Sequence, residues 1–421
     1  MAQDPYHIVC IEPRFPGRLG AIADWLVRRR GYRCWFYCNA FDPQAYWPPS
    51  AGTGLDVIKF EVGGVASEPQ VYWTRNLERG LCYAYGCWEV LDGRRPRPVD
   101  VVLGRSAGLG STLFTPITYP AAGIVNLMDG YLKPREHDIT SELDNDTSVN
   151  YYAWRAAAGT MDLLDMDNGS IPWAATRYQR DSYPEAYRDD FEVFFDGVDV
   201  RLFRRARPER PRMIARRMIP QDAKVVTFVA RSLDRVRGFD RFLRLARRLE
   251  IEFPEAIFVV AGAPIVVRGL DLPFYGTNYL EHLIKESPLV DPSRYWFLGY
   301  VDRPTIAEML GVSDLHVAPG RTFFPARSIV ESMSAECLIL ASDDEPTREL
   351  IENDITGLLV DSTDPDALFE RARAALRDLA AFRPLGQAAG KAARERFDQD
   401  VVLPKLALIF DRLVEGDYAR R

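Results

Sequence analysis

The chain has 421 residues, of which 47% are hydrophobic and 27% are charged, and its formal net charge is −7. This composition excludes a disordered or fibrous protein, and the length favours two domains. The negative net charge excludes a general nucleic-acid-binding protein, because such proteins need a strongly basic surface. The longest apolar run falls well short of the roughly 20 residues of a membrane-spanning helix, and the first residues lack an export signal, so we expect a cytoplasmic protein.

In the first half of the chain, short apolar runs alternate with a stretch of helical periodicity. Runs of four to eight apolar residues bounded by turn residues are typical of buried strands. Strands that alternate with helices predict a parallel α/β sheet. The predicted strands are His7–Glu12, Tyr32–Cys38, Val99–Leu103 and Gly123–Leu127, and the predicted helix is Leu19–Arg30.

The second half repeats this alternation more clearly. The pattern predicts a doubly wound unit of ordinary domain size. Its predicted strands are Lys224–Ala230, Ala256–Ala261, Tyr295–Leu298, Leu315–Ala318 and Leu338–Ala341, and its predicted helices are Phe239–Glu252, a helix that begins at Ser328, and Thr347–Asn353.

The segment Asp196–Pro220 is rich in Arg and Pro and indicates a linker between the two halves. Eight arginines lie between Arg201 and Arg217, offset only by Glu209. Such a run is either a solvated surface or a patch for phosphates or an anionic membrane surface. We expect an N-terminal domain over 1–205, a C-terminal domain over 206–395, and a C-terminal helix over 396–421 that packs back on the N-terminal domain.

Doubly wound sheets bind ligands at the carboxyl ends of their strands. Arg231 directly follows the strand Lys224–Ala230, and Arg237 and Gly238 precede the next helix. Guanidinium groups bind phosphate oxygens in bidentate fashion, so the pair Arg231 and Arg237 is suited to a diphosphate. Exposed arginines at the start of a helix are the alternative interpretation.

A second candidate element is the predicted helix start at Ser328. With Ser328 as N-cap, the N–H groups of Ile329 and Val330 are expected to attract phosphate through unpaired donors and the helix dipole. Glu331 lies in the first turn, where it either complements the dipole or accepts hydrogen bonds from ribose hydroxyls.

Three segments resemble the retaining family 4 glycosyltransferases, and the resemblance is specific from about Trp173 onward. The stretch FFPARSIVESMSAECLILASDDEPTRELIENDITGLLVDSTDPDAL resembles the signature region of that family. ARSLDRVRGFDRFLRL resembles its phosphate-binding segment, and FLGYVDRPTIAEMLGVSDLHVAP resembles the segment beside the nucleobase. The resemblance implies the α/β GT-B architecture, in which two Rossmann-like doubly wound domains face a central cleft.

The resemblance also implies a function and a set of site residues. The implied enzyme moves a sugar from a nucleotide-diphosphate sugar to a glycan, lipid-linked or other hydroxyl acceptor in cell-surface polysaccharide synthesis, with retention of configuration and without a metal ion or other cofactor. The acceptors and the arginine-rich linker permit a peripheral contact with a membrane surface. The implied catalytic residues are Arg231 and Arg237, and the implied donor-binding residues are Gly17, Gly20, Gly238, Gly299, Tyr300, Arg327, Ser328, Ile329, Val330 and Glu331.

Phe323 departs from the family pattern, which has a glutamate eight residues before Glu331. This departure leaves a non-catalytic sugar-nucleotide-binding relative open as an alternative. A sugar-nucleotide epimerase on the same double-Rossmann scaffold is a second alternative. Asp165-Met166-Asp167 has the form of a metal-binding DxD motif, but we expect it to lie within a helix over Ala153–Met166 and to bind no metal. His137 is expected to be structural, since a lone histidine more often is.

Overall fold

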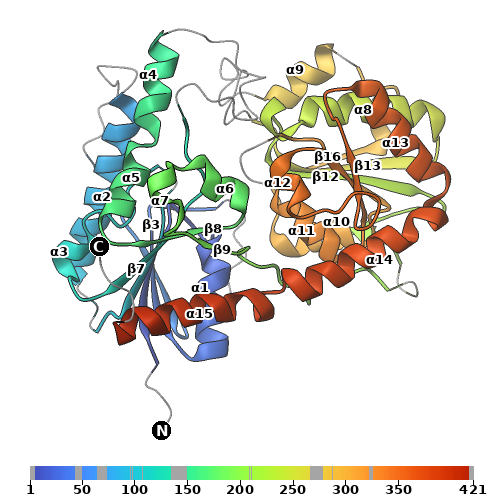
Figure 1. The fold of residues 1–421 in the computed structure, drawn as a ribbon. Helices are drawn as coiled ribbons and strands as arrows, with labels where there is room; N and C mark the ends of the chain where they lie inside the picture. Colours follow the sequence, from blue (N-terminus) through green and yellow to red (C-terminus); the bar gives the residue numbers. More distant parts are fainter. Residues whose placement is uncertain are drawn as a thin grey trace. The chain divides into compact units, whose positions relative to one another are not determined.

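The computed structural model of the chain divides into two compact units (Figure 1). Unit 1 comprises Met1–Glu136, Asp146–Asp196 and Val402–Arg421, and unit 2 comprises His137–Asn145 and Gly197–Val401. The structure describes residues 5–42, 50–63, 74–94, 96, 98–106, 108–133, 149–207, 209, 211–265, 278–286, 288–321 and 326–416. Phe323 and His137 lie outside these residues.

The main sheet of unit 1 is parallel, as the sequence predicts, and its seven strands comprise the four predicted ones and three more. Its strand order is β5-β3-β1-β6-β7-β8-β9, so the order reverses between β1 and β6. Loops that leave the carboxyl ends of strands at such a reversal form the ligand site of doubly wound sheets. The strands are β1 (His7–Ile11), β3 (Arg33–Cys38), β5 (Leu55–Lys59), β6 (Val101–Arg105), β7 (Gly123–Leu127), β8 (Ile171–Ala174) and β9 (Glu192–Val193), and a separate two-residue pair joins β2 (Arg14–Phe15) to β4 (Ala40–Phe41).

Two apolar cores cover the two faces of the unit 1 sheet. Ile8 and Cys10 point into one core, while Val9 and Ile11 point into the other, as the alternation of a strand requires. The predicted α-helical stretch Ala153–Met166 is helical except at Gly159, which separates α4 from α5. A Cβ atom at Gly159 would lie 2.2 Å from the Tyr131 ring. The helices are α1 (Leu19–Arg30), α2 (Arg75–Arg94), α3 (Thr115–Thr118), α4 (Val149–Ala158), α5 (Thr160–Asp167), α6 (Arg177–Ser182) and α7 (Glu185–Arg188).

Unit 2 contains a six-stranded parallel sheet with the order β14-β13-β12-β15-β16-β17. This is the order of a dinucleotide-binding Rossmann sheet, with the reversal between β12 and β15. The five predicted strands are present, and β17 is an additional short edge strand. The strands are β12 (Lys224–Ser232), β13 (Ala256–Ala263), β14 (Tyr295–Gly299), β15 (Leu315–Ala318), β16 (Leu338–Ser342) and β17 (Leu358–Val360).

Helices cover both faces of the unit 2 sheet as well, and two apolar cores result. The predicted helix over Thr347–Asn353 is wrong: the chain forms a short helix two residues earlier, because the Asp344 carboxylate accepts the Thr347 N–H at 3.0 Å and so fixes the helix start. The helices are η3 (Arg235–Arg237), α8 (Phe239–Glu252), α9 (Tyr279–Glu286), η5 (Pro292–Arg294), α10 (Arg303–Gly311), α11 (Arg327–Ser334), α12 (Glu345–Arg348), α13 (Pro365–Arg377) and α14 (Leu379–Arg396).

The arginine-rich segment belongs to unit 2 and is partly ordered as a hairpin of β10 (Met213–Ile214) and β11 (Arg217–Met218). Arg205 and Arg212 form ion pairs with Asp314, at 3.5 and 2.7 Å. Arg204, Arg207 and Arg216 are exposed. The run therefore combines structural arginines with solvated ones.

Within the described residues, the chain passes between the units at Asp196–Gly197 and within the last helix, α15 (Gln399–Glu415), at Val401–Val402. The two connections pair with each other, since the Val198 N–H donates to the Phe397 carbonyl at 2.8 Å and the Gln399 N–H donates to the Val198 carbonyl at 3.1 Å. Within the described ranges, no helix is both long enough and apolar enough to span a bilayer.

Candidate active site

Arg231 lies at the carboxyl end of β12, beside the reversal of strand order in unit 2. The pairing of β12 with β13 shifts register between Val229 and Ser232, so Arg231 falls within an irregularity of the strand. Such irregularities redirect side chains near functional sites. The Arg231 side chain is exposed.

The loop that follows is fixed by a buried carboxylate, Asp234, which is 1% exposed. Asp234 accepts hydrogen bonds from the Ser232 hydroxyl at 2.7 Å and from the Arg237 N–H at 3.1 Å. Asp234 thus caps η3, whose last residue is Arg237. The backbone that carries Arg237 is therefore held in one conformation.

Gly238 brings a second loop against this one. Its φ angle is +76°, and a Cβ atom there would lie 2.6 Å from the Gly320 nitrogen. In turn, a Cβ atom at Gly320 would lie 2.7 Å from the Arg237 carbonyl oxygen. Because neither position has room for a side chain, the loops after β12 and β15 touch through their backbones.

The buried guanidinium of Arg241 stabilises the loop after β15. It donates to the Pro319 carbonyl and to the Ser362 hydroxyl, both at 3.1 Å. Ser362 in turn donates to the same carbonyl at 3.0 Å. The loop after β15 is thereby tied to the helix that follows Arg237 and Gly238.

Helix α11 starts one residue earlier than predicted, so Ser328 is not the N-cap. Ala326 is the N-cap, and it has no side chain that could accept a hydrogen bond. The Ile329 N–H donates to the Ala326 carbonyl at 2.9 Å, whereas Val330 follows in the helical repeat. The Ile329 N–H, which was expected to bind phosphate, is therefore bonded within the helix start. In the part of the chain that the structure describes, no N-cap side chain accepts a hydrogen bond at the positive end of the α11 dipole.

Ser328 has a different role from the one expected. Its hydroxyl lies 3.3 Å from Nε2 of His316, whose Nδ1 lies 3.0 Å from the Thr227 hydroxyl. Burial lowers the pKa of His316 to about 3, so the ring is neutral. A neutral imidazole therefore fastens the first turn of α11 to the strands β12 and β15.

Contrary to the prediction, Glu331 lies beyond the first turn of α11, because the helix begins at Arg327. Its side chain is buried and contacts two arginines. Arg303 Nη1 lies 2.9 Å from Glu331 Oε1, and Arg327 Nε lies 3.3 Å from the same oxygen. Arg303 begins α10, which is capped by Asp302, so both arginines project from helix starts. The carboxylate of Glu331 is thus oriented by two charges before any ligand binds.

Gly299 and Tyr300 follow β14 at the same edge of the sheet, because the carboxyl ends of parallel strands share one edge. Gly299 has a φ angle of +69°, and a Cβ atom there would meet nothing within 4 Å. Tyr300 is half-buried. The predicted residues of unit 2 therefore lie at the carboxyl ends of β12 and β14, in the loops that follow these strands, or on α11.

Gly17 and Gly20 lie in unit 1, in the loop before α1 and in its first turn. A Cβ atom at Gly17 would lie 2.4 Å from the Glu12 carboxylate, and one at Gly20 would lie 2.6 Å from Pro16. Glu12 accepts the Leu19 N–H at 2.7 Å and the Arg18 N–H at 3.1 Å. The first donors of α1 are thus occupied by a buried side chain of the chain itself.

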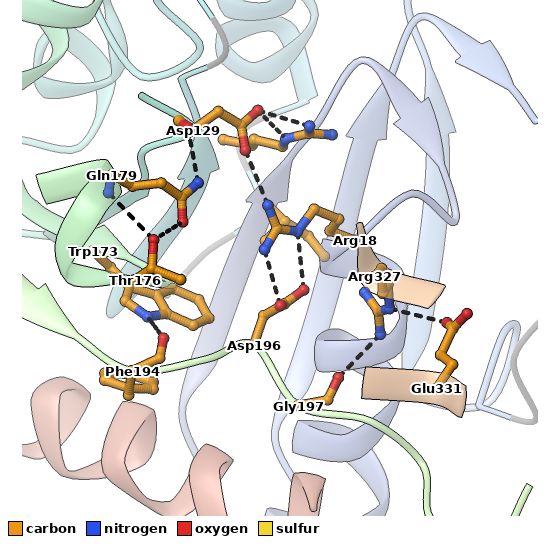
Figure 2. A network of polar contacts seen from close by, with 12 residues as sticks. Arg18, Asp129, Trp173, Thr176, Gln179, Phe194, Asp196, Gly197, Arg327 and Glu331 are labelled. Carbon is orange, nitrogen blue, oxygen red and sulfur yellow. Dashed lines mark hydrogen bonds and ion pairs between the residues drawn. The ribbon is translucent and has the colours of Figure 1, made fainter. Parts of the chain in front are cut away.

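Further charged side chains lie near Glu12 at the reversal of strand order in unit 1. Figure 2 shows two of the contacts, those of Arg18 with Asp129 and Asp196. Arg105 contacts Glu12 at 2.6 Å and Asp129 at 2.7 Å. Arg18 contacts Asp129 at 3.0 Å and Asp196 at 2.9 Å. The network holds two guanidinium groups and three carboxylates, so one negative charge exceeds the positive charges.

The DxD motif is structural. Asp165 is fully buried, and its carboxylate accepts the N–H and the hydroxyl of Thr112 at 3.2 and 3.1 Å. Burial raises the pKa of Asp165 to about 6. Asp165 therefore holds the loop after β6.

Two family matches cover most of the chain. Residues 209–396 match the glycosyl transferases group 1 family, and residues 30–203 match the glycosyl transferase family 4 group. The chain belongs to the group 1, family 4-like glycosyltransferases. No match was found among curated protein sequences.

Solved structures show the fold of this glycosyltransferase. It is similar to a sucrose-phosphate synthase from Thermosynechococcus elongatus, with 15% identity, a TM-score of 0.72, and coverage of 98% of this chain and 100% of that chain. It is also similar to HepE from Anabaena in complex with UDP and glucose, with 15% identity, a TM-score of 0.70, and coverage of 96% and 99%. A glycosyltransferase from Rickettsia africae has 17% identity, a TM-score of 0.63, and coverage of 98% and 100%. The predicted α/β GT-B architecture is confirmed.

Several residues that shape the candidate site of this glycosyltransferase were missed from the sequence. They are Asp234, Gly320, His316, Arg241 and Arg303. Asp234 had a local signal, since an aspartate three residues before Arg237 matches an N-cap spacing. The others act through contacts between residues far apart in the sequence.

Proposed function

We propose that this glycosyltransferase takes its sugar from a nucleotide-diphosphate sugar that binds at the carboxyl edge of the unit 2 sheet. The observation that carries the proposal is the combination of Arg231, the fixed Arg237 loop and the uncapped start of α11 at the reversal of strand order. Guanidinium groups and a helix start together match the charge and the acceptors of a diphosphate. The complex of Anabaena HepE with UDP supports UDP as the first probe.

The transfer proceeds with retention of configuration and without a metal ion in this proposal. The bond from the anomeric carbon to the diphosphate oxygen breaks, and a bond to the acceptor oxygen forms on the same face of the sugar. The proton of the acceptor hydroxyl passes to an oxygen of the leaving diphosphate. Arg231, Arg237 and the α11 donors stabilise the negative charge that develops on the leaving group.

Glu331 binds the ribose in this proposal. Its carboxylate is buried and is fixed by Arg303 and Arg327 before the ligand arrives. A pre-oriented carboxylate accepts hydrogen bonds from vicinal hydroxyls at little entropic cost. Gly299 and Tyr300 lie beside the base, since they leave the same edge of the sheet.

The acceptor is a glycan or lipid-linked hydroxyl in cell-surface polysaccharide synthesis, and the exposed Arg204, Arg207 and Arg216 provide a peripheral contact with an anionic membrane surface. An arginine near such a surface contributes about 1 kcal/mol. Co-sedimentation with anionic and neutral vesicles tests the contact. The test variant replaces Arg204, Arg207 and Arg216 with glutamate. If it binds anionic vesicles as well as the wild type does, the membrane contact is excluded.

A panel of UDP, GDP and dTDP sugars tests the function. Binding is measured by calorimetry, and products are identified by mass spectrometry with and without hydroxyl acceptors. We expect one nucleotide class to bind and its sugar to appear on an acceptor together with free nucleotide diphosphate. An altered sugar without acceptor identifies an epimerase, and tight binding without turnover identifies a binding protein.

A further inference from the structure

Two consecutive residues at the first connection between the units are each held by an arginine (Figure 2). Asp196, the last residue of that part of unit 1, is 1% exposed and receives two contacts of 2.9 Å from Arg18. Gly197, the first residue of the main part of unit 2, accepts a hydrogen bond on its carbonyl from Arg327 Nη2 at 3.1 Å. The connecting peptide is therefore anchored on both sides, within its own units.

The arginine that holds Gly197 is the same one that contacts the predicted ribose-binding carboxylate. Arg327 Nε lies 3.3 Å from Glu331 Oε1, one turn further along α11. Figure 2 shows the guanidinium of Arg327 between the Gly197 carbonyl and the Glu331 carboxylate. A single rigid, planar group thus joins a donor-site residue to the connecting peptide.

The segment after Gly197 contacts the residues that precede and begin α15, so the two described connections lie close together. Val198 forms a bridge with Asp398, and Arg201 forms an ion pair with Asp400 at 2.8 Å. Gly197 itself has a φ angle of +83°, a conformation that other residues adopt only at a cost. A shift at the Gly197 carbonyl therefore acts on the segment that precedes α15 as well.

We propose that Arg327 is a positioning residue that couples occupancy of Glu331 to the connecting peptide. This inference rests on the proposed binding of a nucleotide at Glu331. Ribose hydroxyls that donate to the Glu331 carboxylate compete with Arg327 for the carboxylate oxygens. The Arg327 guanidinium then binds the Gly197 carbonyl more strongly. By thermodynamic linkage, the conformation of the connecting peptide alters nucleotide affinity by the same factor.

Arg303 provides a matched control, because it contacts the same oxygen of Glu331 but not Gly197. In the full-length protein, Arg327→Met and Arg303→Met each remove one cation from Glu331 and keep an aliphatic side chain. Methionine at position 303 also preserves a contact with Phe203, over whose ring the Arg303 guanidinium lies at 4.9 Å. Thermal unfolding of each variant verifies that it is folded.

The experiment measures UDP binding by calorimetry and hydrogen exchange of peptides that cover residues 195–203, with and without saturating UDP. In the wild type and in Arg303→Met, we expect UDP to slow exchange about tenfold, the range of an ordinary coupling. In Arg327→Met, we expect UDP to bind but to leave exchange at the connecting peptide unchanged.

Two results overturn the inference, and they are distinguishable. If UDP binds and Arg327→Met retains the slowed exchange, Arg327 does not couple the two places, and the proposed function stands. If neither UDP nor the other nucleotide diphosphates bind the wild type, the proposed function fails, and the coupling fails with it.

Discussion

The two units place a helix start beside the reversal of strand order in their sheets, but they treat its free N–H groups in opposite ways. In unit 1, the buried Glu12 accepts the Arg18 and Leu19 N–H groups at the start of α1. In unit 2, the N-cap of α11 is Ala326, which has no side-chain acceptor. The same fold therefore provides a helix start that is bonded to a buried carboxylate in one unit and a helix start whose N-cap residue has no side-chain acceptor in the other.

This difference explains why we assign the nucleotide-sugar substrate to unit 2. A helix start attracts an anion only if its donors are not already occupied. In unit 1, the position of such an anion is taken by the Glu12 carboxylate, and the nearby guanidinium groups are neutralised by Asp129 and Asp196. Four variants test the comparison, from the largest expected effect to the smallest.

Glu12→Ala is expected to destabilise unit 1 by about 3–5 kcal/mol, the usual cost of removing one partner of a buried ion pair. The variant removes the acceptor of the Leu19 N–H and one of the two carboxylates that contact Arg105. Chemical denaturation with separate probes for each unit measures the loss. Glu12→Gln keeps a neutral acceptor and is expected to lose less, and a loss below 1 kcal/mol for the alanine variant would contradict the structural role.

Arg231→Ala is expected to weaken UDP binding about 100-fold, because one charge-assisted contact to a phosphate is worth about 2–3 kcal/mol. The thermal stability should not change, since the side chain is exposed. Arg244→Ala removes an exposed arginine from α8 in the same unit and serves as the control. Unchanged affinity in Arg231→Ala would exclude Arg231 from the phosphate site.

Asp162→Asn is expected to change how the stability of unit 1 depends on pH. Burial raises the pKa of Asp162 from 3.8 to about 7, although the Ser106 hydroxyl and the Gly108 N–H donate to it. Between about pH 4 and 7, Asp162 keeps its proton in the folded protein but has lost it in the unfolded chain. The contribution of Asp162 to the free energy of unfolding is therefore complete below pH 4 and is lost as the pH rises through 7. The slope reaches at most about 1.4 kcal/mol per pH unit.

Denaturation of the wild type and the Asn variant at pH 4.5, 5.5, 6.5 and 7.5 measures this difference. We expect the wild type to lose stability relative to Asp162→Asn as the pH rises. Asp165 contributes a smaller slope of the same sign that remains in the variant, since burial raises its pKa to about 6. Parallel pH profiles would show that Asp162 is charged in the folded protein.

Ala326→Asp gives α11 the carboxylate that α1 already has. The backbone of Ala326 is in the extended region that an N-cap needs, so the variant is expected to stabilise unit 2 by about 1 kcal/mol. The same carboxylate should weaken UDP binding by repelling the diphosphate. Ala326→Ser adds a cap without charge and should stabilise without this repulsion, and tighter UDP binding in the aspartate variant would contradict an open phosphate site at α11.

Much of the fold was predictable, because buried parallel strands are marked by local apolar runs such as Lys224–Ala230 and Ala256–Ala261. The edge strand Leu55–Lys59 escaped prediction, since it has only five residues and charged side chains at Asp56 and Lys59 interrupt its apolar run. The arginines of the candidate site were identified by their place after a strand. The start of α11 was misplaced because Ser328 has the residue type of a cap, whereas its hydroxyl binds His316 from β15.

The unit 1 network was not predictable for a related reason. Nothing around Glu12 in the sequence indicates that its carboxylate folds back onto α1 or meets Arg105, which lies 93 residues further along the chain. The approach of Gly238 to Gly320 is of the same kind. Local patterns specify elements, while the chemistry of each helix start depends on partners that only the folded chain brings together.

The path of α15 has a consequence for synthesis on the ribosome. Val402, Leu406 and Phe410 complete the same apolar core as Ile8 and Trp173. Unit 1 is translated first but cannot complete its core until α15 has been synthesised, by which time most of unit 2 has left the ribosome. A chain that stops before Val402 would expose this apolar surface, and we expect such truncated products to aggregate or to be degraded rather than to fold into an independent N-terminal domain.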